Sequence, residues 1–293
     1  MLPKFFHLFP HARALAGGAA GPYAVVMAKE NCAQCQGTGW KVVPRKDGTP
    51  GKVAVACDCS VSDRATHIVE SARIPKRYEH CDFESFVTDL SDSREYTPQA
   101  ERILKQAKLR AEGFVRNYPA GTEKGLLFMG SSGAGKTHLA VAALRELLRR
   151  GHNGLFCDYR ELLKEIQASY NAESQTTEMG VLEPVRTAEI LVLDDLGASK
   201  PSDWVLDIIG LILNARYNER RMTILTTNYY DETGAAAPAV LPSRERIAVR
   251  DDTLANRIGL RMRSRLYEMC ETLEVVAPDF RKEVRGQAGR ARA

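Results

Sequence analysis

The residues with the clearest chemistry stand in one run, G-S-S-G-A-G-K-T, at positions 130–137. Glycines let the backbone curl until several N–H groups point inward, and the positive end of a following helix adds to the anion site. In such a loop the lysine reaches the β- and γ-phosphates and the threonine hydroxyl binds Mg²⁺. The run therefore predicts a nucleoside triphosphate site made of Gly130, Ser131, Ser132, Gly133, Ala134, Gly135, Lys136, Thr137 and His138.

A second group of polar side chains ends two apolar runs further along the chain. Asp194 and Asp195 follow the run at 190–193, and Asn228 follows the run at 222–227. A carboxylate at the end of a buried strand can hold Mg²⁺, and a second one can polarise the attacking water. We expect these roles for Asp194 and Asp195. Asn228 either contacts the γ-phosphate or the water, or is a turn residue at a strand end.

Arginines are concentrated late in the sequence. Arg257, Arg261 and Arg265 recur at every fourth position, which predicts one face of one helix. Three cations without alternating acids on that face repel one another unless an anion lies opposite. A neighbouring subunit's triphosphate or a nucleic-acid backbone would supply that anion, and a solvated stripe is the alternative.

Four of the seven cysteines are clustered near the N-terminus, as C-A-Q-C and C-D-C. The spacing is close to that of four-cysteine zinc ribbons, with the second pair one residue short. A disulfide is disfavoured in a cytosolic chain. We therefore predict a structural Zn²⁺ ion held by the thiolates of Cys32, Cys35, Cys57 and Cys59, with a redox pair or chance clustering as alternatives. Cys81, Cys157 and Cys270 are expected to be small apolar core residues.

Strands and helices that would position these residues alternate along the chain. The expected helices lie at 98–117, after the phosphate loop, and at 160–170. The expected strands lie at 126–129, 155–157, 190–195, 222–228 and 272–276, with a further hairpin strand at 53–56. This alternation favours an α/β fold, and the fully apolar runs favour parallel strands covered on both faces.

Composition and length suggest several parts. Residues 1–26 form a disordered or mis-assigned extension, with Met27 as the expected true start, and 27–62 form the zinc module. A linker at 63–80, with a boundary near Ile74, leads to an ATPase domain at 81–281 and a disordered basic tail at 282–293. We have no functional interpretation for the insertion at 235–252.

The overall charge and hydropathy exclude few functions. The net charge of +4 neither demands nor excludes nucleic acid. The sequence contains no apolar run of roughly 18 residues that could span a membrane, and the N-terminal segment does not resemble a secretory signal. We expect a cytoplasmic protein.

Four motifs, taken in order, resemble those of AAA+ ATPases of the DnaC/DnaI helicase-loader and IstB group. They are G-S-S-G-A-G-K-T-H-L-A, L-V-L-D-D-L-G, T-I-L-T-T-N-Y and R-S-R-L-Y-E-M-C, within a resemblance that covers residues 74–281. The resemblance implies an AAA+ P-loop fold with a parallel core sheet flanked by helices, ATP with Mg²⁺, and single-stranded DNA along the inside of a spiral. It places Asp194 and Asp195 in the Walker B motif, Asn228 as sensor 1, Arg265 as the arginine finger, with Arg261 as second candidate, and Arg281 as sensor 2.

These observations favour an ATP-dependent loader of the replicative DNA helicase. An arginine acting in a neighbouring subunit's site makes a head-to-tail contact, which generates an open ring or spiral. The zinc module would hold the helicase. Tyr159, Lys164 and Tyr170, with Arg220–Arg221, would contact single-stranded DNA, unless they form an ordinary solvated helix.

Three other functional classes are open at this point. An IstB-like transposition helper would bind duplex DNA for a transposase. A small-molecule P-loop kinase is disfavoured by the paired acids, the sensor asparagine and the late arginines. A zinc-dependent adaptor with a vestigial ATPase is disfavoured by the intact Lys136, Thr137, Asp194 and Asp195.

Overall fold

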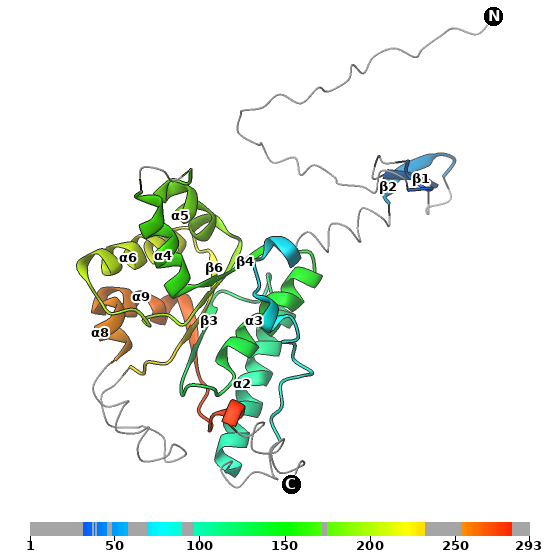
Figure 1. The fold of residues 1–293 in the computed structure, drawn as a ribbon. Helices are drawn as coiled ribbons and strands as arrows, with labels where there is room; N and C mark the ends of the chain where they lie inside the picture. Colours follow the sequence, from blue (N-terminus) through cyan, green and yellow to red (C-terminus); the bar gives the residue numbers. More distant parts are fainter. Residues whose placement is uncertain are drawn as a thin grey trace, which may run out of the picture. The chain divides into compact units, whose positions relative to one another are not determined.

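The structure is a computed structural model of the chain. It describes residues 32–36, 38, 40–45, 49–57, 69–89, 97–171, 175–231 and 253–282. The chain divides into two compact units, Met1–Arg64 and Ala65–Ala293, each of which is considered separately below (Figure 1). Our predictions for 1–26, Cys59, the 235–252 insertion and the tail from 283 lie outside the described residues.

The first unit contains a two-stranded antiparallel hairpin. β1 (Trp40–Pro44) pairs with β2 (Lys52–Ala56), and Val42 lies opposite Ala54 in the register. A tight turn precedes it, in which the N–H of Gln36 donates to the carbonyl of Cys32 at 2.8 Å. The predicted returning strand is confirmed, and the hairpin brings the first cysteine pair close to Cys57.

The second unit is built on a five-stranded parallel sheet, as predicted. Its strands lie in the order β4-β5-β6-β3-β7. They are β3 (Gly125–Met129), β4 (Gly154–Asp158), β5 (Ile190–Asp194), β6 (Met222–Thr227) and β7 (Cys270–Glu274). Every residue of β3 and β5 is buried, because helices cover both faces of the sheet.

The helices form two layers around this sheet (Figure 1). α2 (Pro98–Asn117) and α3 (Lys136–Arg149) pack together on one face. The other face is covered by α4 (Tyr159–Ser169), α5 (Glu178–Thr187), α6 (Asp203–Asn218), α8 (Leu254–Ile258) and α9 (Leu260–Met269). The order of the strands reverses between β3 and β6. In open α/β sheets, ligands bind in the crevice at the carboxyl ends of the strands at such a point.

The described part of the expected linker belongs to the second unit, which corrects our boundary near Ile74. The carbonyl of Ala72 accepts from the N–H of Phe156 in β4 at 2.7 Å, and Ala72 is fully buried. Cys81, Phe83 and Phe86 are buried in the same core. The 3-10 turn η1 (Lys76–Tyr78) lies within this segment. The chain therefore joins the ATPase fold before residue 72.

Two further predictions of secondary structure need correction. The arginine row does not lie on one helix, because Gly259 adopts φ +83° and separates α8 from α9. Arg257 is therefore on α8, whereas Arg261 and Arg265 are on α9. The closing strand is Cys270–Glu274, two residues earlier than predicted.

The scattered cysteines behave as predicted. Cys81 and Cys270 are buried, and Cys157 is partly buried against the core. Burial raises the pKa of Cys270 to about 12, so this thiol stays protonated. Within the described ranges, no helix combines the length and the apolar character needed to cross a bilayer.

Candidate nucleotide site and cysteine cluster

The glycine-rich loop joins β3 to α3 at the carboxyl edge of the sheet, as the motif predicts. Gly133 and Gly135 adopt positive φ angles of +76° and +97°, which side chains rarely tolerate. Gly135 is also the N-cap residue of α3, and it offers no side chain to the first N–H groups of that helix. Those groups can therefore receive an anion, as they do in other phosphate loops.

Lys136 is buried at the base of this loop. Its Nζ donates to the carbonyls of Gly130 and Ser131, at 3.0 and 2.7 Å, and to Oδ1 of Asn228 at 2.7 Å. Burial lowers the pKa of Lys136 to about 8, and Asp195 and Asp194 act in the opposite direction. The positive charge of Arg281 adds to the lowering, so two cations face the same space.

Asp194 ends β5 within reach of the phosphate loop. Its Oδ1 accepts from the hydroxyl of Thr137 at 2.8 Å and from the hydroxyl of Thr226 at 2.6 Å. Burial raises the pKa of Asp194, whereas the two hydroxyl bonds lower it. The oxygens of Thr137 and Asp194 are the hard donors that Mg²⁺ prefers, so this pair fits a magnesium site.

Thr226 is a site residue that we did not predict. It is buried in β6, and its hydroxyl both donates to Asp194 and accepts the N–H of Asp195 at 2.9 Å. The sequence carried a signal for it, because T-T-N ends an apolar strand beside the acidic pair. Threonine is common in strands, however. Only the pairing of β5 with β6 brings this one within hydrogen-bond distance of both Asp194 and Asp195.

Asp195 and Asn228 complete a connected polar chain. Asp195 adopts φ +59°, a left-handed conformation that is uncommon for a residue with a side chain. Its Oδ1 accepts from Nδ2 of Asn228 at 2.6 Å, and Asn228 in turn accepts from Lys136. The three predicted residues therefore lie together, in the order Lys136, Asn228, Asp195.

These residues line a cavity of about 560 Å³. That volume lies within the usual range of small-molecule sites. Segment 77–87 forms a second wall, and Phe280 and Arg281 form a third. Another groove, of about 700 Å³, lies among residues 122–125 and 216–222 at the opposite ends of the strands. It contains none of the motif residues, so its larger size does not make it the nucleotide site.

His138 connects the phosphate loop to segment 77–87. Its Nε2 lies 2.8 Å from the carbonyl oxygen of Asp82 and 3.3 Å from Oγ of Ser85. The ring also packs edge-on against Phe86, at 5.3 Å between centroids. Phe86 in turn occupies the space where a side chain at Gly135 would lie, 2.5 Å from an added Cβ. His138 thus fixes a cavity wall against the loop.

The late arginines separate into different environments. Arg257 lies over the ring of Tyr229 at 4.5 Å, and Arg265 lies over the ring of Tyr217 at 5.3 Å. Arg261 is exposed on α9. The cavity's lining includes none of these three, although it includes Arg281. Arg281 is therefore the one predicted late arginine that the fold of this chain brings to the cavity.

Our predicted DNA-contacting set does not form one surface. Tyr159 is buried, with 1% of its surface exposed, so its ring cannot stack on a base. Tyr170 is exposed, and its hydroxyl accepts from Nε1 of Trp204 at 3.2 Å. Arg220 and Arg221 follow the other end of α6, which at 1.5 Å per residue is about 24 Å long. Tyr170 therefore belongs with Trp204 and not with these arginines.

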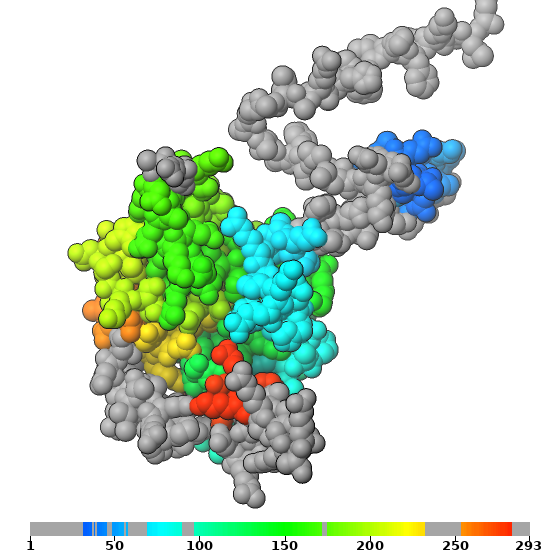
Figure 2. All heavy atoms as spheres, viewed as in Figure 1, coloured from blue at the N-terminus to red at the C-terminus, as the bar shows by residue number. Residues whose placement is uncertain are grey.

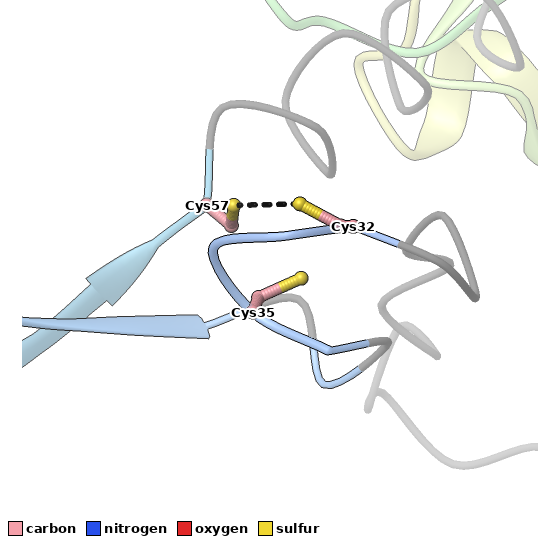
Figure 3. A group of neighbouring side chains, drawn as sticks. All are labelled: Cys32, Cys35 and Cys57. Atoms are coloured by element: carbon pink, nitrogen blue, oxygen red, sulfur yellow. Dashed lines mark hydrogen bonds between the residues drawn. The ribbon is translucent and has the colours of Figure 1, made fainter.

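The clustered cysteines meet at the end of the hairpin in the first unit (Figure 3). The sulfur atoms of Cys32, Cys35 and Cys57 all lie within 4.8 Å of one another, and those of Cys32 and Cys57 are 3.7 Å apart. Tetrahedral Zn²⁺ with bonds of about 2.3 Å holds its sulfur ligands about 3.8 Å apart. The three described thiols fit such a site, and Cys59 lies outside the described residues.

Comparisons with known proteins identify the family. The sequence profile described as IstB-like ATP binding protein matches residues 64–237, which is more than half of the chain. The chain is a member of this family. The crystal structure of the DnaC helicase loader is similar to the IstB-like chain at 32% identity and a TM-score of 0.52. That match covers 69% of our chain and 99% of the DnaC chain. The fold is thus that of an AAA+ ATPase.

Curated relatives are similar over a shorter stretch. The replicative helicase loader DnaC of Buchnera aphidicola subsp. Schizaphis graminum is 27% identical over 155 residues, 53% of this IstB-like chain and 58% of the relative. The replicative helicase loader DnaI of Bacillus subtilis is 32% identical over 118 residues, 40% of this chain and 37% of DnaI. This chain therefore spans little more than half the length of the DnaC relative. The family membership supports ATP binding at the cavity described above.

Proposed function

We propose that this protein is an ATP-dependent loader that places a replicative DNA helicase on single-stranded DNA. The observation that carries the proposal is the match to the DnaC helicase loader, which covers almost all of that structure. The polar chain from Lys136 to Asp195 supports it, because a loader that uses ATP as a switch needs a complete site. The zinc module also supports the proposal, because an ATPase that contacts only DNA does not need a separate unit to hold a protein partner.

The residues of the cavity divide the work of ATP binding and hydrolysis. The phosphate loop and Lys136 bind the β- and γ-phosphates, which requires Lys136 to exchange its carbonyl partners for phosphate oxygens. Thr137 and Asp194 would hold Mg²⁺, which would supply charge neutralisation at the phosphates. Asp195 orients and polarises the attacking water, and Asn228 holds Asp195 in place relative to Lys136. Arg281 stabilises negative charge that builds up on the γ-phosphate.

Arg261 is a better candidate for the arginine finger than Arg265. An arginine that enters a neighbouring subunit's site must be free to leave its own surface. Arg265 packs on Tyr217 and has a buried Nη1, whereas Arg261 is exposed on α9. Beside it, the apolar residue Leu260 is 79% exposed, which suits a contact with a second copy. We therefore propose head-to-tail assembly through this part of α9.

Tyr170 and Trp204 are the proposed base-stacking residues for single-stranded DNA. Their rings pack edge to face at 6.5 Å between centroids, and the exposed Tyr170 keeps a face open to solvent. Aromatic stacking is tolerant of sequence, as loading at different sites requires. Lys164 pairs with the exposed Glu161 and can exchange that partner for a phosphate at little cost.

The zinc module is the proposed helicase-holding part. Zn²⁺ bound by Cys32, Cys35, Cys57 and Cys59 would stabilise a hairpin too small to fold around an apolar core alone. Because the module forms a compact unit of its own, it can contact a partner without rearranging the ATPase fold.

The second candidate function is the IstB-like transposition helper, which the family profile favours. Co-purification with the replicative helicase separates the two. A loader is expected to retain the helicase through residues 27–62 and to lose it when that module is deleted. Binding to duplex DNA in preference to single-stranded DNA, with no helicase retained by either form, would establish the helper instead.

A further inference from the structure

The chain that follows β7 runs back along the phosphate loop. We call residues 275–282 the C-terminal strap (red in Figure 2). The N–H of Val275 donates to the carbonyl of Met129 at 2.7 Å. The hydroxyl of Ser131 donates to the carbonyl of Ala277 at 2.7 Å and lies 3.3 Å from the N–H of Ala277. The N–H of Phe280 donates to the carbonyl of Gly133 at 3.2 Å. The strap is therefore bonded to the end of β3 and to the loop at three points, through Val275, Ala277 and Phe280.

The strap lies so close to the phosphate loop that two glycine positions of the loop have no room for a side chain. A Cβ atom at Gly130 would lie 2.0 Å from the carbonyl oxygen of Val275. A Cβ atom at Gly133 would lie 1.9 Å from Oδ1 of Asp279. Both distances are far shorter than any van der Waals contact allows. The backbone of the strap thus requires glycine at position 130, and the Asp279 side chain lies in the space that a side chain at position 133 would need.

Asp279 links this contact to Arg281. The same Oδ1 that lies against Gly133 accepts the backbone N–H of Arg281 at 3.1 Å. This bond caps the short turn in which the strap ends, as aspartate does at the start of helices. The turn directs residues 280 and 281 to the cavity that Lys136 and Asp194 also line. One carboxylate oxygen therefore touches the loop and fixes the backbone of the arginine.

We propose that Asp279 is a positioning residue that couples Arg281 to the phosphate loop. The same carboxylate lies against the loop and caps the turn. A movement of the loop around a triphosphate is therefore expected to move Arg281 with it. Arg281 then meets the γ-phosphate at a fixed place, whereas a free C-terminal turn would leave it mobile. This inference rests on the proposed function, because it takes Arg281 to act on bound ATP.

The test is a double-mutant cycle read as the ratio of ATP affinity to ADP affinity, measured by titration of the full chain with fluorescent nucleotide analogues. Asp279→Ala removes the shared oxygen and is expected to lower this ratio by about tenfold, within the range seen when a positioned group shifts by about 1 Å. Asp279→Asn keeps an oxygen at the same position and should lose much less. Glu274→Ala, which removes an exposed carboxylate at the end of β7, is the matched control and should change nothing.

The decisive comparison uses Arg281→Ala as the background. If Asp279 acts through Arg281, then Asp279→Ala adds no further loss once Arg281 is absent, since residues in one network are not additive. Additive losses, or an equal loss of ATP and ADP affinity, would overturn the proposal. The readout is a binding ratio, so it does not require hydrolysis. If the proposed function is wrong, the wild-type chain will bind nucleotide but will neither hydrolyse ATP nor retain the helicase. That result is separate from the outcome of the double-mutant cycle.

Discussion

Replacing Thr226 by valine is the sharpest test of the site's architecture. Valine keeps the shape and volume of threonine but removes the hydroxyl that joins Asp194 to the N–H of Asp195. Because Thr226 is buried in β6, the valine side chain occupies the same space in the core. The variant therefore isolates the contribution of the hydroxyl.

The expected loss follows from the two bonds. A hydrogen bond to a carboxylate contributes about 1.5–3 kcal/mol, and the partly buried N–H of Asp195 costs about 1 kcal/mol when it loses its partner, the low end of the range for a buried group. Valine regains part of this because it is more readily buried than a hydroxyl. We therefore expect the free energy of unfolding to fall by about 3 kcal/mol, equivalent to about 6–12 °C in Tm for a unit of this size.

Urea unfolding followed by circular dichroism measures this change. Thr226→Ser is the control, since it keeps the hydroxyl and loses about 1 kcal/mol with its methyl group. The valine variant should also lose ATP hydrolysis at mildly acidic pH first. Removing the Thr226 bond leaves burial to raise the pKa of Asp194 further, so the carboxylate is protonated at a higher pH. A valine variant as stable as the serine variant would refute the reasoning.

Three further predictions concern other parts of the molecule. Burial depresses the pKa of Lys136 to about 8, so the folded state without nucleotide favours neutral Lys136 and its stability should rise between pH 8 and the ordinary lysine range. Lys136→Met should abolish ATP binding yet raise Tm at pH 7 in the absence of nucleotide, and a lower Tm would contradict this. Arg261→Ala should stop ATP hydrolysis but not ATP binding, and mixing it with Lys136→Ala should restore turnover, because each lacks a different half of a shared site. Arg265→Ala should retain turnover, and the opposite result would return the finger to Arg265. Cys57→Ser should reduce bound zinc from one equivalent toward none by metal analysis, while ATP affinity stays unchanged because the cysteines lie in a separate unit. Loss of ATP affinity would show that the two units depend on each other.

The arginine helix shows where sequence reasoning reached its limit. Spacing alone placed Arg257, Arg261 and Arg265 on one face, because a four-residue repeat is all that a helix pattern requires. Gly259 adopts a positive φ of +83°, which breaks the helix and changes the register between its parts. Glycine in a sequence permits such a break but does not require it. The exposure of Arg261 and the packing of Arg265 followed only once α8, α9 and α6 were placed.

The prediction that Tyr159 contacts DNA was wrong for a similar reason. An aromatic residue beside cations is compatible with either a stacking surface or a core position. The packing of α4 against its neighbours buries Tyr159, whereas Tyr170 at the far end of the same helix is exposed beside Trp204. A helical period of 3.6 residues separates faces, but it does not say which face the sheet will cover.

The sequence by itself determined the phosphate loop, the acids that end β5, the parallel sheet and the cysteine hairpin. Each depends on local rules: glycines that permit a tight turn, apolar runs that must be buried on both faces, and ligand spacing within a hairpin. The tertiary structure alone decided which distant residues share an atom. Thr226 meets Asp194 because β6 pairs with β5, and Asp279 meets Gly133 because the chain after β7 returns over the loop. Such contacts depend on the order of strands and the direction of a returning segment, and those are set by the packing of the whole unit.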